Sequence, residues 1–206
     1  MGMGALRRSS EQRQVELADA ALHLIATKGI AALTTRSLAD EVGLTSGAIF
    51  KHFESLEVLL DAVVARVEQV LAATYPPAEL EPVERLEAFL EARSNAVGRQ
   101  LGILRLVLSD QFQLALPRRG SARLSACVAQ TRAFVLGCLR EGQATGVLRS
   151  DLAAETLAPI VMGTIQMLAL TPSKRGHDAD AQPVLESLLA LLRTPVPPST
   201  NRKRSP

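Results

Sequence analysis

Residues 34–53, TTRSLADEVGLTSGAIFKHF, contain two short apolar patterns that meet at one glycine. Apolar residues up to Val42 are spaced three and four positions apart, which predicts a short helix with one apolar face. Gly43 can adopt the left-handed conformation that ends a helix. Thr45 is suited to begin the next helix, in which Ile49 is the first apolar residue. The stretch therefore predicts two short helices joined by a tight turn.

The same helical spacing extends over longer segments of the chain, and no segment shows the alternation typical of strands. Aromatic residues are few, with five Phe, one Tyr and no Trp, so aliphatic side chains must fill the core. We therefore expect an all-α protein of about nine helices, with the longer ones near residues 10–28, 55–74, 82–100, 102–116, 121–143, 151–171 and 184–193.

Several local details of these helices are also predicted. Asp151 is expected to cap the uncharged helix that follows it, and residues 173–182 read as a polar loop. In the segment 121–143, the residues expected to face inward are Leu124, Val128, Ala129, Val135 and Leu139. The proline-rich basic tail is expected to be disordered.

The stretch 34–53 fits a helix-turn-helix unit, whose two helices cross at a steep angle over a tight turn. Ala39 provides a small residue where the helices cross, and the long helix before the unit can support it. On the second helix, small residues precede Lys51 and His52, and no acidic residue is present. Such a surface is expected of a helix that enters the major groove of DNA. The alternative is a tight corner within an ordinary helical core.

The sequence resembles the TetR family of bacterial transcriptional regulators. The similarity lies in KGIAALTTRSLADEVGLTSGAIFKHFESLEVLL, and it covers roughly residues 10–60. The family pattern G-x-x-x-x-T-x-R-x-[LI]-A-x-x-x-G-[VL] is present from Gly29 through Leu44, with one extra residue in the first spacing. The element GAIFKHF-x-S follows from Gly47 to Ser55.

The resemblance implies a ligand-responsive homodimeric repressor that binds a double-stranded DNA operator, and whose last two long helices pair with those of the partner as a four-helix bundle. It also implies that nine residues lie at or near DNA: Thr35, Arg36, Thr45, Ser46, Gly47, Ala48, Phe50, Lys51 and His52. Two positions depart from the family pattern, because Phe50 is usually tyrosine and Leu56 usually lysine. Both usual residues contact phosphate, so their loss should weaken non-specific affinity, and the basic arm at Arg7 and Arg8 can compensate.

The predicted organisation is a helix-turn-helix domain with a basic arm over residues 1–56, an effector-binding and dimerisation domain over 57–195, and the tail 196–206. An apolar effector is expected among the helices between 82 and 171. The candidate pocket residues are Arg105, Ser109, Gln113, Arg132, Met162 and Gln166, with Met167 as additional lining. The helix 55–74 links the two domains and is the expected lever between effector and DNA.

Other classes of protein fit the sequence less well. The net charge of +2 does not indicate nucleic acid by itself, so DNA binding must depend on local placement of charge. The uncharged run 156–173 is nearly long enough to cross a membrane, but its Pro159 and Gln166 favour a fully buried helix in a soluble, cytoplasmic protein. Cys127 and Cys138 read as small buried apolar residues.

An enzyme is the main rival class. The three histidines have no serine or aspartate setting typical of catalysis, and no phosphate loop or zinc motif is present, so no catalytic residue, metal or cofactor is predicted. A further alternative is a DNA-binding regulator that has no small-molecule ligand and responds to a protein partner. A closed core without a cavity would favour that alternative.

Overall fold

The computed structural model describes residues 10–99, 103, 114, 116, 118–170 and 177–194. This part of the chain contains eight α-helices, one short 3-10 helix and a single isolated bridge between Leu148 and Arg193. The all-α fold is thereby confirmed. The elements are α1 (Ser10–Lys28), η1 (Ile30–Ala32), α2 (Thr35–Val42), α3 (Ser46–Phe50), α4 (Leu56–Ala72), α5 (Pro82–Arg99), α8 (Arg118–Ala144), α9 (Ala154–Leu170) and α10 (His177–Leu192).

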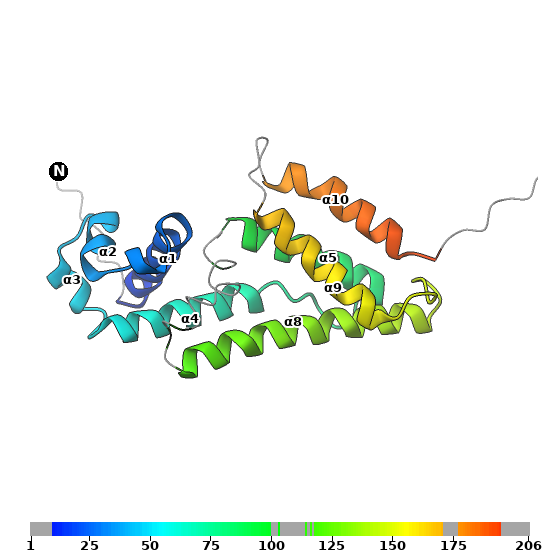
Figure 1. Ribbon diagram of the computed structural model, residues 1–206, viewed down its shortest axis with the longest axis horizontal. Coiled ribbons are helices and arrows are strands. Elements are labelled where there is room, and N and C mark those ends of the chain that lie inside the picture. Colours follow the sequence, from blue (N-terminus) through cyan, green and yellow to red (C-terminus); the bar gives the residue numbers. More distant parts are fainter. Residues whose placement is uncertain are drawn as a thin grey trace, which may run out of the picture.

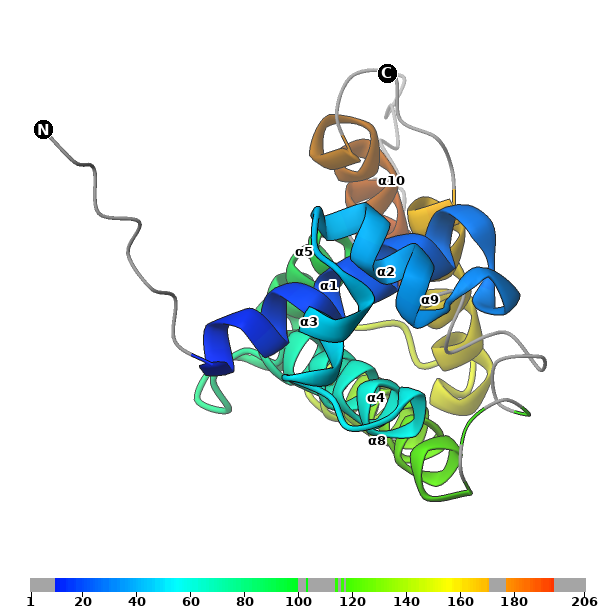
Figure 2. The ribbon, with the colours of Figure 1, turned by 90° about the vertical axis from the view of Figure 1, so that its left-hand side faces the viewer.

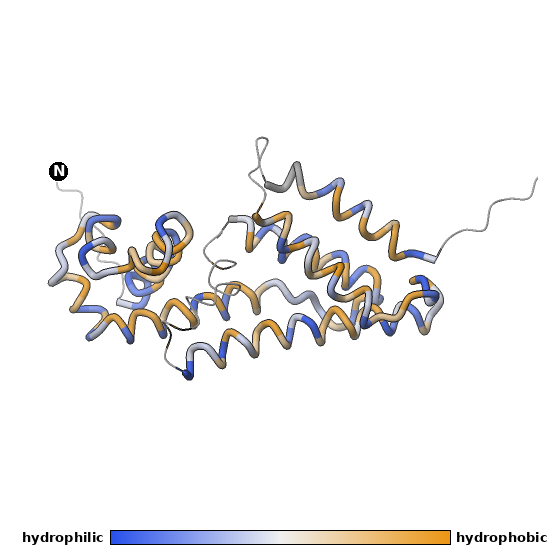
Figure 3. The backbone as a smooth tube through the Cα atoms, viewed as in Figure 1, coloured by the Kyte–Doolittle hydropathy of each residue, from blue (hydrophilic) through white to orange (hydrophobic). Residues whose placement is uncertain are grey.

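The molecule is elongated, with α1, α2 and α3 at one end and α5, α8, α9 and α10 at the other (Figure 1). Helix α4 runs from the first group toward the second, and it packs against both α1 and α8. Hydrophobic residues recur along each long helix with polar residues between them, as Figure 3 shows. This pattern gives each helix one face for the interior and one for solvent.

Two hydrophobic cores result from this arrangement. The first core joins the helices α1, α2, α3 and α4, and it includes the fully buried side chains of Leu17, Leu24 and Leu38. The apolar stripe of α4, from Leu59 to Leu71, is buried in this same core. The second core joins α5, α8, α9 and α10 and contains a cluster of three rings, in which Tyr75 stacks on Phe89 and Phe134 packs at an angle to both.

Ion pairs fix α4 to its neighbours on both sides. Arg66 of α4 donates from Nε and Nη2 to the two carboxylate oxygens of Asp19 in α1, at 2.7 and 3.1 Å. Arg123 of α8 pairs with Glu68 in α4, and its Nη1 donates to Asp61 at 2.7 Å. Because a planar guanidinium can donate two parallel hydrogen bonds, such pairs orient two helices as well as holding them together.

The ends of α9 and α10 differ from those predicted. Helix α9 begins at Ala154, and Asp151 accepts hydrogen bonds from Arg149 instead of capping it. Helix α10 begins at His177, so residues 177–182 are helical and do not belong to a polar loop. Ala181 in this earlier part of the helix is buried, so packing supports the earlier start.

Two predictions of burial were also wrong. Val128 and Ala129 of α8 are exposed, whereas Leu124, Val135 and Leu139 are buried as expected. Helix α9 is not fully buried, because Ile160 and Met167 are more than half exposed. The described residues cover only one face of α8 and only one face of α9. Within the described residues, no helix is long and apolar enough to cross a membrane.

The turn after α8 generates a prediction about packing. The chain folds back so that Leu148 N–H donates to the Gly142 carbonyl at 2.9 Å, and a Cβ at position 142 would lie 2.6 Å from Leu148 Cδ1. Gly142→Ala should therefore destabilise the protein by about 1–3 kcal/mol, the cost of overpacking. Urea unfolding at fixed protein concentration measures this change.

Gly137→Ala in the same helix is the matched control. A Cβ there meets only Glu141 Oε1, at 3.9 Å, so the substitution should stabilise the helix by roughly 0.5–1 kcal/mol. Equal stability of the two variants would contradict the packing of Leu148 on α8.

Candidate functional site

The turn between α2 and α3 is built from hydrogen bonds that the sequence encodes locally. Thr34 caps α2, because its Oγ1 accepts from Ser37 N–H at 3.0 Å while Ser37 Oγ accepts from Thr34 N–H at 2.9 Å. Gly43 ends α2 in the left-handed region with φ of 67°. Leu44 N–H then donates to the Ala39 carbonyl at 2.9 Å, which completes the glycine-ended turn.

Apolar contacts hold the two helices at this turn. Leu38, Ala39 and Ile49 are buried, and Val42 and Leu44 pack against the same core. These are the residues that the sequence assigned to the crossing of the helices and to their support, and the prediction is confirmed. The short helix α3 therefore has a fixed position relative to α1 and α4.

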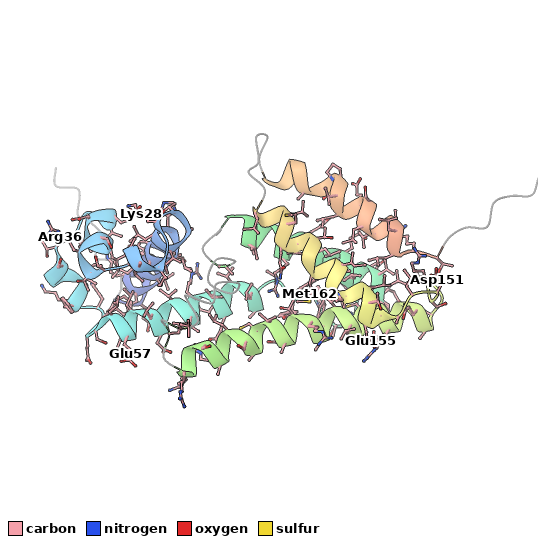
Figure 4. The ribbon with its side chains drawn as sticks, in the orientation of Figure 1. Lys28, Arg36, Glu57, Asp151, Glu155 and Met162 are labelled. Carbon is pink, nitrogen blue, oxygen red and sulfur yellow. The ribbon has the colours of Figure 1, made fainter. Side chains whose placement is uncertain are left out.

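Helix α3 lies at the far end of the molecule, at the left in Figure 1 and facing the reader in Figure 2. Thr45 caps it by accepting from Ala48 N–H at 3.2 Å, which leaves the hydroxyl proton of Thr45 free to donate elsewhere. Lys51, at the C-terminal cap, is exposed. Arg36 is exposed too, and in Figure 4 it points outward from the same end.

The nine candidate DNA residues all belong to this end, and none of them is buried. Gly47 is exposed and Ala48 half-buried, so the start of α3 presents little side-chain bulk. Phe50 is 49% exposed, which is unusual for a large aromatic ring. Together these residues form a surface of small, apolar and basic groups without a carboxylate on α3 itself.

His52 is less accessible than its neighbours. Its carbonyl oxygen accepts a hydrogen bond from Gln14 Nε2 at 3.1 Å, which ties the end of α3 to α1. Its ring Nδ1 is buried and has no hydrogen-bond partner among the described residues. Any contact of His52 with phosphate would therefore have to be made by Nε2.

A pocket lies in the other half of the molecule, between α4, α5, α8 and α9. Its cavity volume is about 60 Å³, which is below the range of roughly 300–1,000 Å³ typical of small-molecule pockets. Most of its wall is apolar, formed by Leu71, Val97, Ile103, Val128, Met162 and Ile165. The polar residues on its wall are Arg93, Thr131 and Gln166, and Cys127 lines it as well.

Only some of the candidate residues predicted from the sequence line this pocket. Met162 and Gln166 line it as predicted, and Figure 4 marks Met162 on α9. The prediction for Arg132 was wrong, because this residue is exposed on α8 and does not line the pocket. The prediction that Met167 adds to the lining was also wrong, because this residue is 66% exposed. The remaining candidates, Arg105, Ser109 and Gln113, lie outside the described residues.

Comparison with known proteins now adds to this geometry. Residues 17–63 match the model of the N-terminal domain described as bacterial regulatory proteins, tetR family. The matched region begins in α1, ends in α4 and contains the whole turn described above. Residues 17–63 are therefore a domain of the TetR family.

Three similar proteins extend this relationship beyond the matched region. The transcriptional repressor KstR2 of Rhodococcus jostii is 27% identical over 146 residues, which cover 69% of this chain and 71% of that protein. The structure of KstR2 from Mycobacterium tuberculosis has a TM-score of 0.77 at 23% identity and covers 89% of this chain and 96% of that one.

The third is the structure of AibR in complex with isovaleryl coenzyme A and operator DNA, with a TM-score of 0.69 at 19% identity. It covers 89% of this chain and 100% of that one. The solved structures show the shared fold, and the relatives are named as transcriptional regulators. The chain is thus a DNA-binding transcriptional regulator.

The pocket candidates chosen from the sequence did not include one residue of the wall, although the sequence carries a signal for it. Arg93 falls on the apolar stripe of α5, which runs through Leu86, Leu90 and Val97 at helical spacing. A charged residue on the buried stripe of a helix is uncommon and points to a special role. No comparable signal in the sequence marks Thr131, which lies on α8 beside the exposed Arg132.

The cap of α2 gives a prediction about the stability of the fold. Thr34→Ala removes the acceptor for Ser37 N–H and should destabilise the protein by about 1 kcal/mol. Thr35→Ala is the matched control, because Thr35 is the first residue of α2 and not its cap. Thermal unfolding measures the stability of both variants. An equal loss of stability in the two would contradict the assignment of Thr34 as the cap.

Proposed function

We propose that this chain is a cytoplasmic, homodimeric repressor that binds a double-stranded operator and is released from it by a small, mostly apolar effector. The observation that carries the proposal is the surface of α3, which is exposed at the end of the molecule, has small residues at its start and bears no carboxylate. The match to the tetR family model over the same residues supports it.

The proposed roles of the DNA-facing residues follow from their positions. Thr45, Ser46, Gly47 and Ala48 begin α3, where small side chains allow close approach to base edges in the major groove. Lys51 and His52 follow α3, where contact with phosphate is expected, and Thr35, Arg36 and Phe50 flank this surface. Phosphate contacts position a protein on DNA, whereas base contacts specify the sequence.

The dimer is proposed to form through α9 and α10. Both helices expose large apolar side chains, and the most exposed on each are Met167 and Leu191, at 66% and 67%. Contiguous apolar surface of this kind marks a partner interface in soluble proteins. A two-fold interface between these helices would give the four-helix bundle that the family resemblance implies.

The pocket supports a small-molecule effector over control by a protein partner alone. Its wall is mostly apolar, and it lies against the end of α4, whose Leu71 contributes to it. AibR, which shares the fold, was solved with isovaleryl coenzyme A and operator DNA. An effector here could act on DNA by favouring one position of α4 and hence one spacing of the two α3 helices in the dimer.

The proposed domain organisation is that of the sequence, with residues 1–56 binding DNA and residues 57–195 binding the effector and the second subunit. Helix α4 belongs by sequence to the second domain, but its buried stripe packs in the first core. A helix that packs in one domain and lines the pocket of the other is a suitable lever between them.

Selection of bound sites from random DNA tests the function directly. A symmetric dimer predicts a palindromic motif, because two-fold protein symmetry is mirrored in the operator. Leu191→Glu places a charge on the proposed dimer surface, so it should shift sedimentation from dimer to monomer and abolish recovery of the palindrome. Failure of the wild-type protein to enrich any sequence would refute the proposal.

Lys51→Ala tests the DNA surface itself. It should weaken binding to operator and scrambled DNA alike, and lower the salt dependence by about one released counterion. Replacement of Lys28, a basic residue of the same end that pairs with Glu41 at 3.6 Å, is the control, and Lys28→Ala should change the salt dependence less. Titrations at several salt concentrations measure both variants. An unchanged salt slope in Lys51→Ala would remove α3 as the reading helix.

A further inference from the structure

Arg93 is a buried cation without a carboxylate partner. Only 4% of the residue is exposed, and among the described residues it forms no ion pair. Buried guanidinium groups are normally paired, since an uncompensated charge in a protein interior is costly. Arg66, Arg85 and Arg123, which are more exposed, each have a carboxylate at hydrogen-bond distance.

The groups that do surround Arg93 compensate its charge only in part. Its Nη2 donates to the Leu71 carbonyl at 3.2 Å, whereas its Nε has no hydrogen-bond partner among the described residues. Its guanidinium carbon lies 5.1 Å from the ring centre of Tyr75 and 4.8 Å from that of Phe89. Aromatic faces attract a cation but accept no strong hydrogen bond in its plane.

Arg93 is nevertheless charged. Burial lowers the pKa of its guanidinium, because removal from water disfavours the charged form, and Tyr75 opposes this effect. Arginine remains protonated in proteins because its pKa in water lies far above neutral pH. The side chain therefore carries a full positive charge at the wall of the pocket, and its buried Nε–H has no partner among the described residues.

We propose that the pocket binds an amphipathic monocarboxylate, whose carboxylate pairs with Arg93 and whose apolar body lies against Leu71, Val97, Met162 and Ile165. The inference rests on the proposed function, because it names the chemical class of that effector. Arg93 is the one charged side chain among the described residues of the wall, so a single negative charge matches it. Gln166 offers an amide to the remaining oxygen, and a planar guanidinium suits a carboxylate.

The same residue connects the pocket to α4. The Leu71 carbonyl, in the last turn of α4, accepts hydrogen bonds from Arg93 Nη2, from Thr74 N–H at 3.2 Å and from Thr74 Oγ1 at 2.7 Å. A carboxylate would compete with this carbonyl for the guanidinium. Binding of the anion would thus alter a contact at the end of the helix that also packs against the DNA-binding unit.

The test compares acids with uncharged molecules of the same shape. Isothermal titration calorimetry of the full chain uses octanoate and decanoate against octanol and decanol, with octyl phosphate as a second anion. The acids should bind about tenfold more tightly than the alcohols or better, since hydrogen bonds to charged groups contribute more than neutral ones. Octyl phosphate should bind less tightly than octanoate, because its second charge has no partner.

Arg93→Met keeps an unbranched apolar side chain and should abolish the preference for acid over alcohol. Arg93→Lys keeps the charge and should retain part of the preference. Arg132→Met is the matched control, because Arg132 is exposed on α8 and does not line the pocket, and it should behave as the wild type. Thermal unfolding of ligand-free Arg93→Met should show no loss of stability, whereas a purely structural arginine would give a lower melting temperature.

Equal binding of acids and alcohols by the wild-type protein overturns the proposal, as does failure of the acids to bind or tighter binding of octyl phosphate. If Arg93→Met does not fold, Arg93→Lys and the wild-type comparison still decide the question. The proposed function is tested separately by DNA selection, which uses the ligand-free protein. An effector of another class would therefore overturn this inference and leave the repressor function in place.

Discussion

The position of α4 is the constraint on which the rest of the structure depends. Its apolar stripe is buried in the core of the DNA-binding end, and its ion pairs reach α1 through Arg66 and α8 through Arg123. Each guanidinium uses more than one donor, so the pairs limit rotation of the helices as well as their separation. α4 is therefore tied to α1 through Arg66 and to α8 through Arg123.

Contacts with its neighbours explain how α3, a helix of only five residues, is held in place. α3 is too short to be stable by itself, because helix nucleation is costly and few hydrogen bonds repay it. Its stability comes from the cap at Thr45, from burial of Ile49 and from the bond between Gln14 and the His52 carbonyl. Its orientation is in turn fixed by the glycine turn before it and by the buried Phe53 after it.

The parts of the fold that the sequence predicted well are those set by local chemistry. The cap at Thr45 and the turn at Gly43 depend on residues close to one another in the chain, so they can be read directly. The pocket could not be read in this way, because its wall draws on helices far apart in the sequence. Arg132 and Met167 were chosen for their chemistry, but the rotation of their helices, which packing decides, places both outside it.

Phe50 and Leu56 bear on how this DNA-binding regulator would be distributed in a cell. Both side chains are partly exposed at the DNA-binding end and offer no donor to phosphate. Sequence-independent affinity comes almost entirely from such phosphate contacts, and a genome presents vastly more ordinary sites than operators. A repressor with fewer of these contacts spends less time on ordinary DNA, so a smaller number of molecules suffices to keep an operator occupied.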